Sequence, residues 1–269
     1  MLLTVEHVTQ FRFAEPATHS VQYIRMTPRA DFCQRVRRWE VRTSGQVTPW
    51  TDGFDNPCHT VCLDGEHDEV KVTVVGEVET SDTNGVLPMD DGLPPEIFLT
   101  PTVYTQAGKA VADFAAPLAS VLAQEGALGT GHALMAAVAD AVAYEPGQTT
   151  VETKAADALK AGKGVCQDQA HLFIAAARHL GLPARYVSGY LATSENNDSH
   201  LASHAWAEIL VDRLGWVSFD PANAQCATEA YVRLAVGLDY GTACPLRGLR
   251  LGGGVEEMDV RVSIQSQAQ

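Results

Sequence analysis

Basic residues are scarce in this chain of 269 residues, which has 19 Lys and Arg against 33 Asp and Glu and a formal net charge of −14. The densest basic stretch is the short QRVRR at residues 34–38. Proteins bind nucleic acid by presenting a positive face to its phosphates. We therefore expect no nucleic acid partner.

Long hydrophobic runs are also missing. A membrane helix needs about 20 mainly apolar residues, and a secretory leader needs a basic start followed by an apolar stretch. The first ten residues, MLLTVEHVTQ, instead mix apolar and charged residues. We therefore expect no signal peptide and no membrane partner.

Cysteine is sparse, and its spacing fits neither a disulfide framework nor a metal site. Without a leader, the six cysteines are best interpreted as reduced thiols in the cytoplasm: Cys33, Cys58, Cys62, Cys166, Cys226 and Cys244. CHTVC (58–62) is not C-x-x-C, and HLASH (200–204) lacks the glutamate of a helical zinc site. The loop SENNDSH (194–200) is too poor in ligands for calcium, so a solvated loop is favoured. We predict no metal and no cofactor.

The first part of the chain is rich in period-two patterns. In EVKVTVVGEVE (69–79), Val70, Val72 and Val74 share one face of a strand, and sequences such as TSGQ and DGFDNP mark turns. Residues 85–101 carry four prolines and two glycines and suit a linker. We predict an antiparallel β domain over residues 1–100 and a second domain over residues 101–269.

The second part begins with alanine-rich helical patterns. Three helices are predicted at residues 107–124, with a break at Pro117, 132–144 and 153–161. A fourth, amphipathic helix is predicted to begin at Cys166, with Asp168, His171 and Arg178 on its polar side. Strands are predicted at residues 184–191, 203–211, 215–221 and 258–264, and the sequence does not reveal the partner of the last one.

The stretch GKGVCQDQA (162–170) places Cys166 at a helix start behind two glycines. No Ser, Thr, Asp or Asn precedes it, so the first N–H groups of the helix are predicted to be free. Such donors favour a thiolate and can hold an oxyanion, and Gly162 and Gly164 would let a substrate approach the backbone. A cysteine alone is as well explained by core packing, so this interpretation needs partners.

Two partners follow downstream. His204 opens SHAWAEILV and Asp220 closes GWVSFD, with a turn predicted at residues 213–215. Such a hairpin would bring an imidazole base and an orienting carboxylate together, as a thiol nucleophile requires. Each residue alone has an ordinary explanation, a core histidine and a turn aspartate. Trp206 shares the strand face of His204, where it would line a site or pack in the core.

Three ordered motifs resemble the core of the transglutaminase-like superfamily: G-x-C-x-D at residues 164–168, H-A-W-x-E at 204–208 and D-P-A-N at 220–223. TPR, TDGFDNP and GEVET in the first part, and VGLDYGTACPLRG (236–248), resemble its bacterial subfamily with an N-terminal β region. The resemblance implies an α+β fold in which a papain-like transglutaminase core, helices packed on an antiparallel sheet, follows an antiparallel β domain.

The resemblance also implies an activity. Cys166 would be the nucleophile, His204 the base and acid, and Asp220 the orienting residue of a cysteine-dependent hydrolase that cleaves peptide or isopeptide amides through a thioester. One alternative is a transglutaminase that passes the acyl group to an amine, and another is a catalytically silent interaction module. Gly164 and Trp206 are candidate substrate-binding residues. The substrate, the second oxyanion donor, the role of the β region and the oligomeric state stay open.

Overall fold

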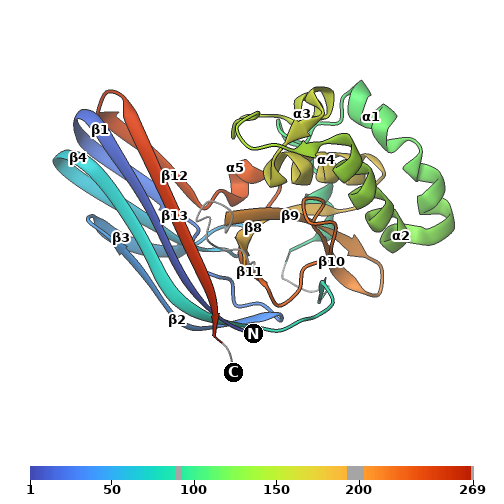
Figure 1. Cartoon of the computed structure of the whole chain (residues 1–269), viewed down its shortest axis with the longest axis horizontal. Helices are drawn as coiled ribbons and strands as arrows, with labels where there is room; N and C mark the ends of the chain where they lie inside the picture. The colour runs from blue at the N-terminus through green and yellow to red at the C-terminus, as the bar shows by residue number, and fades with distance from the viewer. Residues whose placement is uncertain (89–92, 193–202, 268–269) are drawn as a thin grey trace.

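The computed structural model describes residues 1–88, 93–192 and 203–267. A sheet of long strands stands beside a second, shorter-stranded sheet, and the helices pack on the second sheet (Figure 1). This arrangement confirms the predicted α+β class, with an antiparallel β region and helices packed on an antiparallel sheet.

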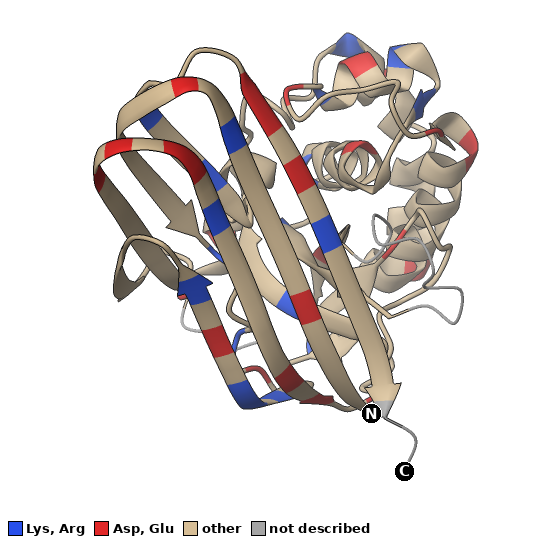
Figure 2. Cartoon of the chain, turned by 60° about the vertical axis from the view of Figure 1, so that its left-hand side comes forward, with Lys and Arg blue, Asp and Glu red and all other residues tan. Residues whose placement is uncertain are grey.

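The first sheet has the strand order β12-β1-β4-β2, with β13 also paired to β1 and β3 also paired to β4. Its strands are β1 (Leu2–Ile24), β2 (Gln34–Thr43), β3 (Gln46–Thr51), β4 (Pro57–Thr80), β12 (Leu246–Gly252) and β13 (Glu256–Gln267). Val70, Val72 and Val74 of β4 are all fully buried, which confirms the face predicted from their spacing. Charged residues of both signs lie along the strands of this sheet on the side shown in Figure 2.

Both ends of the chain meet in the first sheet. The first half of β1 pairs with β13 and the second half pairs with β12, both antiparallel. The strand predicted at residues 258–264 therefore lies within β13, and its partner is β1. Residues 246–267 thus belong to the same sheet as the N-terminal strands, while the domain division near residue 100 stays a prediction.

The second sheet is antiparallel in the order β11-β8-β9-β10-β5. Its strands are β5 (Val86–Leu87), β8 (Ala184–Leu191), β9 (Ser203–Val211), β10 (Gly215–Phe219) and β11 (Tyr231–Gly237). Every residue of β8, β10 and β11 is buried. The reason is that the sheet packs on a helix and contributes Tyr190, Val232 and Leu234 to a core shared with the first sheet, while Val187, Trp206 and Tyr231 form a further buried cluster.

The helical layer follows the sequence pattern with differences in the second helix and at residues 143–144, which were predicted as helix and form a short strand. It contains a 3-10 turn η1 (Pro95–Leu99) and the helices α1 (Lys109–Ala115), α2 (Leu118–Ala141), α3 (Ala155–Ala161), α4 (Cys166–His179) and α5 (Tyr240–Ala243). The predicted break at Pro117 is confirmed, because α1 ends before it and α2 begins after it. Helix α2 then continues across the gap predicted after residue 124, interrupted only at Gly126, whose φ is 71°.

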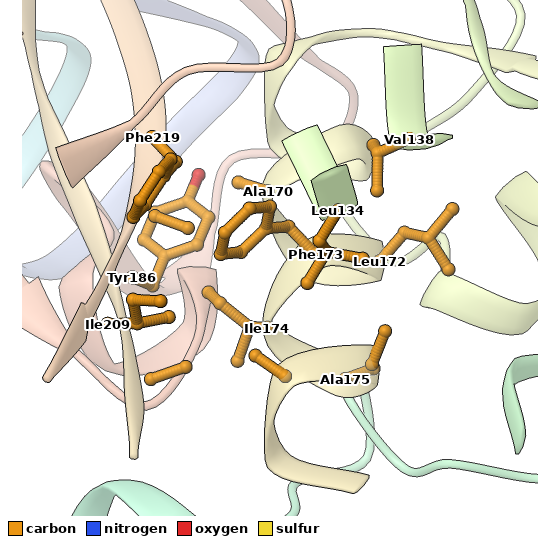
Figure 3. Packing of buried hydrophobic residues seen from close by; sticks show 14 of the residues in the cluster. Leu134, Val138, Ala170, Leu172, Phe173, Ile174, Ala175, Tyr186, Ile209 and Phe219 are labelled. Carbon is orange, nitrogen blue, oxygen red and sulfur yellow. The ribbon is translucent and has the colours of Figure 1, made fainter. Parts of the chain in front are cut away.

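Helix α4 lies at the centre of the core, where Phe173 and Ile174 pack with Leu134, Ile209 and Phe219 (Figure 3). The predicted polar side of this helix is wrong as a solvent-facing surface, because Asp168, His171 and Arg178 are all buried. Surrounding loops, β8 and α5 cover that side. Each of the three side chains has hydrogen-bond partners inside the protein, while Asp168 Oδ1 and His171 Nδ1 have none among the described residues.

Arg178 is a buried polar side chain whose three guanidinium nitrogens all have hydrogen-bond partners. Its guanidinium donates to the carbonyl oxygens of Phe98, Ala184 and Leu238 and to the Thr105 hydroxyl, at 2.8–3.1 Å. A buried charge without such partners would cost several kcal/mol, roughly, in folding free energy. The residue therefore ties the C-terminal end of α4 to the segments around it.

Candidate active site

Cys166 is the first residue of α4 and is half-buried. The residue before it, Val165, makes no side-chain cap; its backbone N–H donates to Asp168 Oδ2 at 2.8 Å. Asp168 also accepts a hydrogen bond from the Thr149 hydroxyl at 2.6 Å. The N–H groups of Cys166 and Gln167 have no acceptor among the described residues, as expected for an uncapped first turn. They are available to a bound group.

The two glycines before Cys166 are required for reasons of local geometry. Gly162 ends α3 with a left-handed φ of 69°. A Cβ on Gly164 would lie 2.6 Å from Asp168 Oδ2 and 2.8 Å from Asp168 Cβ. Close packing between Gly164 and Asp168 thus shapes the turn that carries Cys166. The predicted contact of Gly164 with a substrate stays a prediction.

His204 and Asp220 meet as the predicted hairpin requires. Strands β9 and β10 pair antiparallel around a turn in which Arg213 has a φ of 62° and Gly215 a φ of 116°. His204 Nε2 lies 2.7 Å from Asp220 Oδ2, and both side chains are buried. The sequence therefore brings an imidazole and a carboxylate into direct hydrogen-bond contact.

The electrostatics favour a charged imidazole. Burial alone would lower the pKa of His204, but hydrogen bonds to Asp220 and to the Cys166 side chain outweigh it and raise the pKa to about 10. Burial likewise raises the pKa of Asp220, and the hydrogen bond and charge of His204 bring it below its usual value. The structure brings all three predicted residues near one another: His204 hydrogen-bonds the Asp220 carboxylate, and His204 and Cys166 line one cavity.

The sequence did not reveal all the residues that hold Asp220. The Tyr231 hydroxyl, from β11, donates to Asp220 Oδ2 at 2.7 Å. Asn223 Nδ2 also lies 2.7 Å from that oxygen and 3.3 Å from His204 Nε2. Asn223 is the last residue of the D-P-A-N motif, and the structure places its side chain beside the pair. Nothing in the pattern of β11 singles out Tyr231.

Two further aromatic residues, Trp206 and Tyr144, lie near Cys166, His204 and Asp220. Trp206 is fully buried, with its ring 6.2 Å from the His204 ring and 5.2 Å from the Tyr231 ring, centroid to centroid. It packs behind His204, and its contact with substrate stays a prediction. Tyr144 pairs with Gly164 across two short parallel strands, β6 (Ala143–Tyr144) and β7 (Lys163–Gly164). Burial, helped by the charges of Cys166 and Asp220, raises the pKa of Tyr144 to about 12.

A cavity of about 280 Å³ opens at Cys166 and His204. The start of α4, strands β8 and β9, and Tyr240 form its core side. The opposite side comes from the first sheet, with His7, Thr9 and Phe11 of β1 and Met258 and Val260 of β13. The β region therefore forms part of the site that contains Cys166.

The other motifs considered for metals have structural explanations where they are described. Cys58 is buried in β4, and the six cysteines are free thiols. Within residues 1–88, 93–192 and 203–267, no group of three His, Cys, Asp or Glu side chains could hold a metal ion. SENNDSH (194–200) and His200 of HLASH lie outside the described residues.

Over the same described part of the chain, no helix is long and apolar enough to span a membrane. The cytoplasmic location stays a prediction.

Comparison with known proteins agrees with this geometry. Residues 118–221 match the transglutaminase-like superfamily, and residues 3–79 match the bacterial transglutaminase-like N-terminal region. The uncharacterized protein ML0607 of Mycobacterium leprae is 31% identical over 282 aligned residues, which cover 97% of this chain and 98% of that protein. The uncharacterized protein Mb2599c of Mycobacterium bovis is 42% identical over 115 residues, 39% of this chain and 37% of its own.

A solved structure shows the same fold. A candidate cysteine protease from Cytophaga hutchinsonii superposes with a TM-score of 0.77 at 20% identity, covering 100% of this chain and 91% of that one. The chain belongs to the transglutaminase-like superfamily, in the bacterial form with the N-terminal β region. The resemblance seen in its motifs is thereby confirmed.

Proposed function

We propose that this protein is a cysteine-dependent amide hydrolase that acts on a peptide or protein substrate through a thioester. The observation that carries the proposal is the position of His204, which lines the same cavity as Cys166 and lies 2.7 Å from the Asp220 carboxylate. An imidazole held between a thiol and a carboxylate can exchange protons with substrate while stabilising a thiolate.

In the first half of the proposed reaction, Cys166 Sγ attacks the carbonyl carbon of an amide. The C–S bond forms and the C–N bond breaks, while the His204 imidazolium gives its proton to the leaving nitrogen. The free N–H of Cys166 would donate to the carbonyl oxygen as negative charge develops on it. The products are a thioester on Cys166, a free amine and a neutral His204.

In the second half, water enters in place of the amine. His204 takes a proton from that water, its oxygen bonds to the acyl carbon, and the C–S bond breaks as the thiolate leaves. A carboxylic acid is released, and the thiolate and imidazolium are restored. Asp220 keeps its hydrogen bond to His204 throughout and stabilises the imidazolium.

The test uses a peptide library with free, amidated and isopeptide-linked members, incubated with the intact protein and analysed by mass spectrometry. We expect cleavage that Cys166→Ala abolishes, and an acyl adduct on Cys166 when reactions are quenched in acid. Equal cleavage by the wild type and Cys166→Ala would refute the proposal. Adding methylamine tests the transfer alternative, because amide formation that outcompetes hydrolysis would make the protein a transglutaminase.

A further inference from the structure

The cavity beside Cys166 has two walls that come from different sheets. On the core side lie Val165, Cys166 and Gln167 at the start of α4. On the other side, β1 and β13 pair so that Thr9 stands opposite Val260 and Phe11 opposite Met258, and all four side chains line the cavity. Because paired residues on neighbouring strands project to the same face of a sheet, these two pairs form one continuous wall.

This wall carries no charge. Among the described residues that line the cavity, none is Asp, Glu, Lys or Arg. The one titratable group that the first sheet contributes is His7, whose Nδ1 lies 2.8 Å from the Tyr190 hydroxyl and whose Nε2 lies 3.0 Å from the Thr9 hydroxyl. Burial lowers the pKa of His7 to about 4, so its ring is neutral at pH 7. Among the described lining residues, the charged groups are then the His204 imidazolium and, in the proposed reaction, the Cys166 thiolate.

From this geometry we infer that the cavity binds the acyl group of the substrate, and that this group is uncharged and largely apolar. A charged acyl group would lose water there without gaining a partner of opposite charge from the sheet wall. The inference rests on the proposed function for the bond that is attacked. It goes further by naming the substrate class and by giving the β region a role in selecting it.

The cavity is assigned to the acyl group because of where Cys166 lies. Cys166 and both of its neighbours in the chain line the cavity, and in the proposed reaction the acyl group stays on Cys166 after the amine has left. The volume of about 280 Å³ sets the size. An apolar cavity of about 150 Å³ holds one benzene molecule, so this one has room for a bulky aromatic or branched group.

The first test measures binding without catalysis. In a Cys166→Ala background, we expect hexanamide and phenylacetamide to bind with dissociation constants at least about tenfold below that of succinamate, measured by ligand-observed NMR. Met258→Lys adds a positive charge at the exposed rim of the wall and should reduce this preference by about tenfold. Glu257→Gln is the matched control, because it also raises the net charge by one but lies on the opposite face of β13.

The second test measures acylation of the protein with Cys166 present. The probes are the p-nitrophenyl esters of hexanoic acid, phenylacetic acid and succinic acid, the last with one free carboxylate. Each rate is divided by the rate of the same ester with 2-mercaptoethanol, which removes differences in intrinsic reactivity. We expect the neutral esters to be favoured at least about tenfold, with the same response to Met258→Lys and no response to Glu257→Gln.

The two tests separate the two proposals. A neutral preference in binding together with no acylation of Cys166 would overturn the proposed function and leave the cavity inference standing. Acylation of Cys166 with equal or stronger preference for succinyl groups would support the function and overturn the inference. Equal responses to Met258→Lys and Glu257→Gln would also overturn it, because the effect would then come from net charge alone.

Discussion

Cys166 shares the protein with five other thiols, which serve as internal controls for its reactivity. At pH 6 an ordinary thiol with a pKa of about 8.5 is almost wholly protonated and reacts slowly with iodoacetamide. We expect Cys166 to be labelled at least about tenfold faster than Cys62, which is also half-buried, because His204 can hold a thiolate beside it. Peptide mapping by mass spectrometry measures both rates in one sample.

His204→Ala should remove this advantage while leaving the labelling of Cys62 unchanged. If Cys166 were no faster than Cys62 in the wild type, the thiolate would not exist at neutral pH. The silent interaction module would then become the better interpretation of the fold.

The pKa of His204 sets a limit on activity at high pH. Its folded value of about 10 lies above the usual 6.5. The imidazolium therefore persists at pH 7–9, and it is lost as the pH rises through about 10. We expect the rate of Cys166 acylation by a peptide amide to stay level over pH 7–9 and to fall above that range.

Asp220→Asn should move the alkaline limit to lower pH, because the carboxylate is the group whose hydrogen bond contributes most to the raised pKa of His204. Rates of amide cleavage measured from pH 6 to pH 11 on both proteins give this comparison. A limit at the same pH in both would mean that Asp220 does not set the charge of the imidazole.

At the scale of residues, the sequence predicted the site residues that lie next to a recognisable helix start or turn. Cys166 follows Gly164 at a helix start, and His204 and Asp220 lie at the open end of a hairpin whose turn contains Gly215, so their positions in space follow from short-range rules. Tyr231 contacts Asp220 through the far strand of the sheet, and His7 reaches the cavity from the other sheet. Contacts between strands that are not paired with each other leave no local pattern.

At the scale of elements, an ion-pair network joins the second sheet to the loop before β2. Glu208 of β9 is fully buried and accepts hydrogen bonds from Arg185 of β8 at 2.6 Å and from Arg233 of β11 at 3.0 Å. Arg233 also contacts Asp31. The guanidinium of Arg185 lies 4.0 Å from the centre of the Trp216 ring. The side chains of three neighbouring strands are thus held by one carboxylate.

Glu208→Gln should destabilise the protein by about 3–5 kcal/mol, because it leaves two buried guanidinium groups with less negative charge than they need. Urea denaturation followed by fluorescence measures the free energy of unfolding. Glu152→Gln, at an exposed position in a loop, is the matched control and should change it by less than about 0.5 kcal/mol.

The pH dependence follows from the same network. Burial would raise the pKa of Glu208, but Arg233 and Arg185 hold it below its usual value. The stabilisation from the Glu208 carboxylate is therefore fully present above the pKa that Glu208 has in the unfolded chain. It is lost as the pH falls through the lower pKa that Glu208 has in the folded protein. The difference in stability between the wild type and Glu208→Gln should shrink in acid. A difference that stayed constant would contradict this origin.

Element types were predictable, but their surroundings were not. Helix α4 was found from its period, and the polar arc opposite Cys166 was expected to face water because an amphipathic pattern usually does. In the protein, Arg178 on that arc is buried and satisfied by loop carbonyls. Strand β13 was found from its alternation, but its partner β1 lies more than 200 residues earlier, beyond the reach of local patterns.

At the scale of the whole molecule, one apolar cluster holds the two sheets together. Leu3, Val5 and Val78 of the first sheet pack with Tyr190, Val232 and Leu234 of the second, and Val262 and Ile264 of β13 complete the cluster. Such a shared core predicts that the sheets unfold together. The four tryptophans report on both sheets, since Trp39 and Trp50 lie in the first, and Trp206 and Trp216 in the second.

Val262→Asp tests this coupling. It puts a carboxylate into the shared core, where Val262 is 2% exposed, and should cost about 3–5 kcal/mol of unfolding free energy. Ser263→Asp adds the same charge one residue later, on the exposed face of β13, and should change the free energy by less than about 0.5 kcal/mol. Urea unfolding is followed by tryptophan fluorescence and by far-UV circular dichroism.

If the two sheets form one cooperative unit, both signals should move together to lower urea in Val262→Asp, and neither should move in Ser263→Asp. Two separated transitions, with only one shifted, would instead show that the first sheet folds apart from the core. The cavity at Cys166 would then depend on docking between two independent units. A single shifted transition would mean that β13 also fixes one wall of the cavity at Cys166.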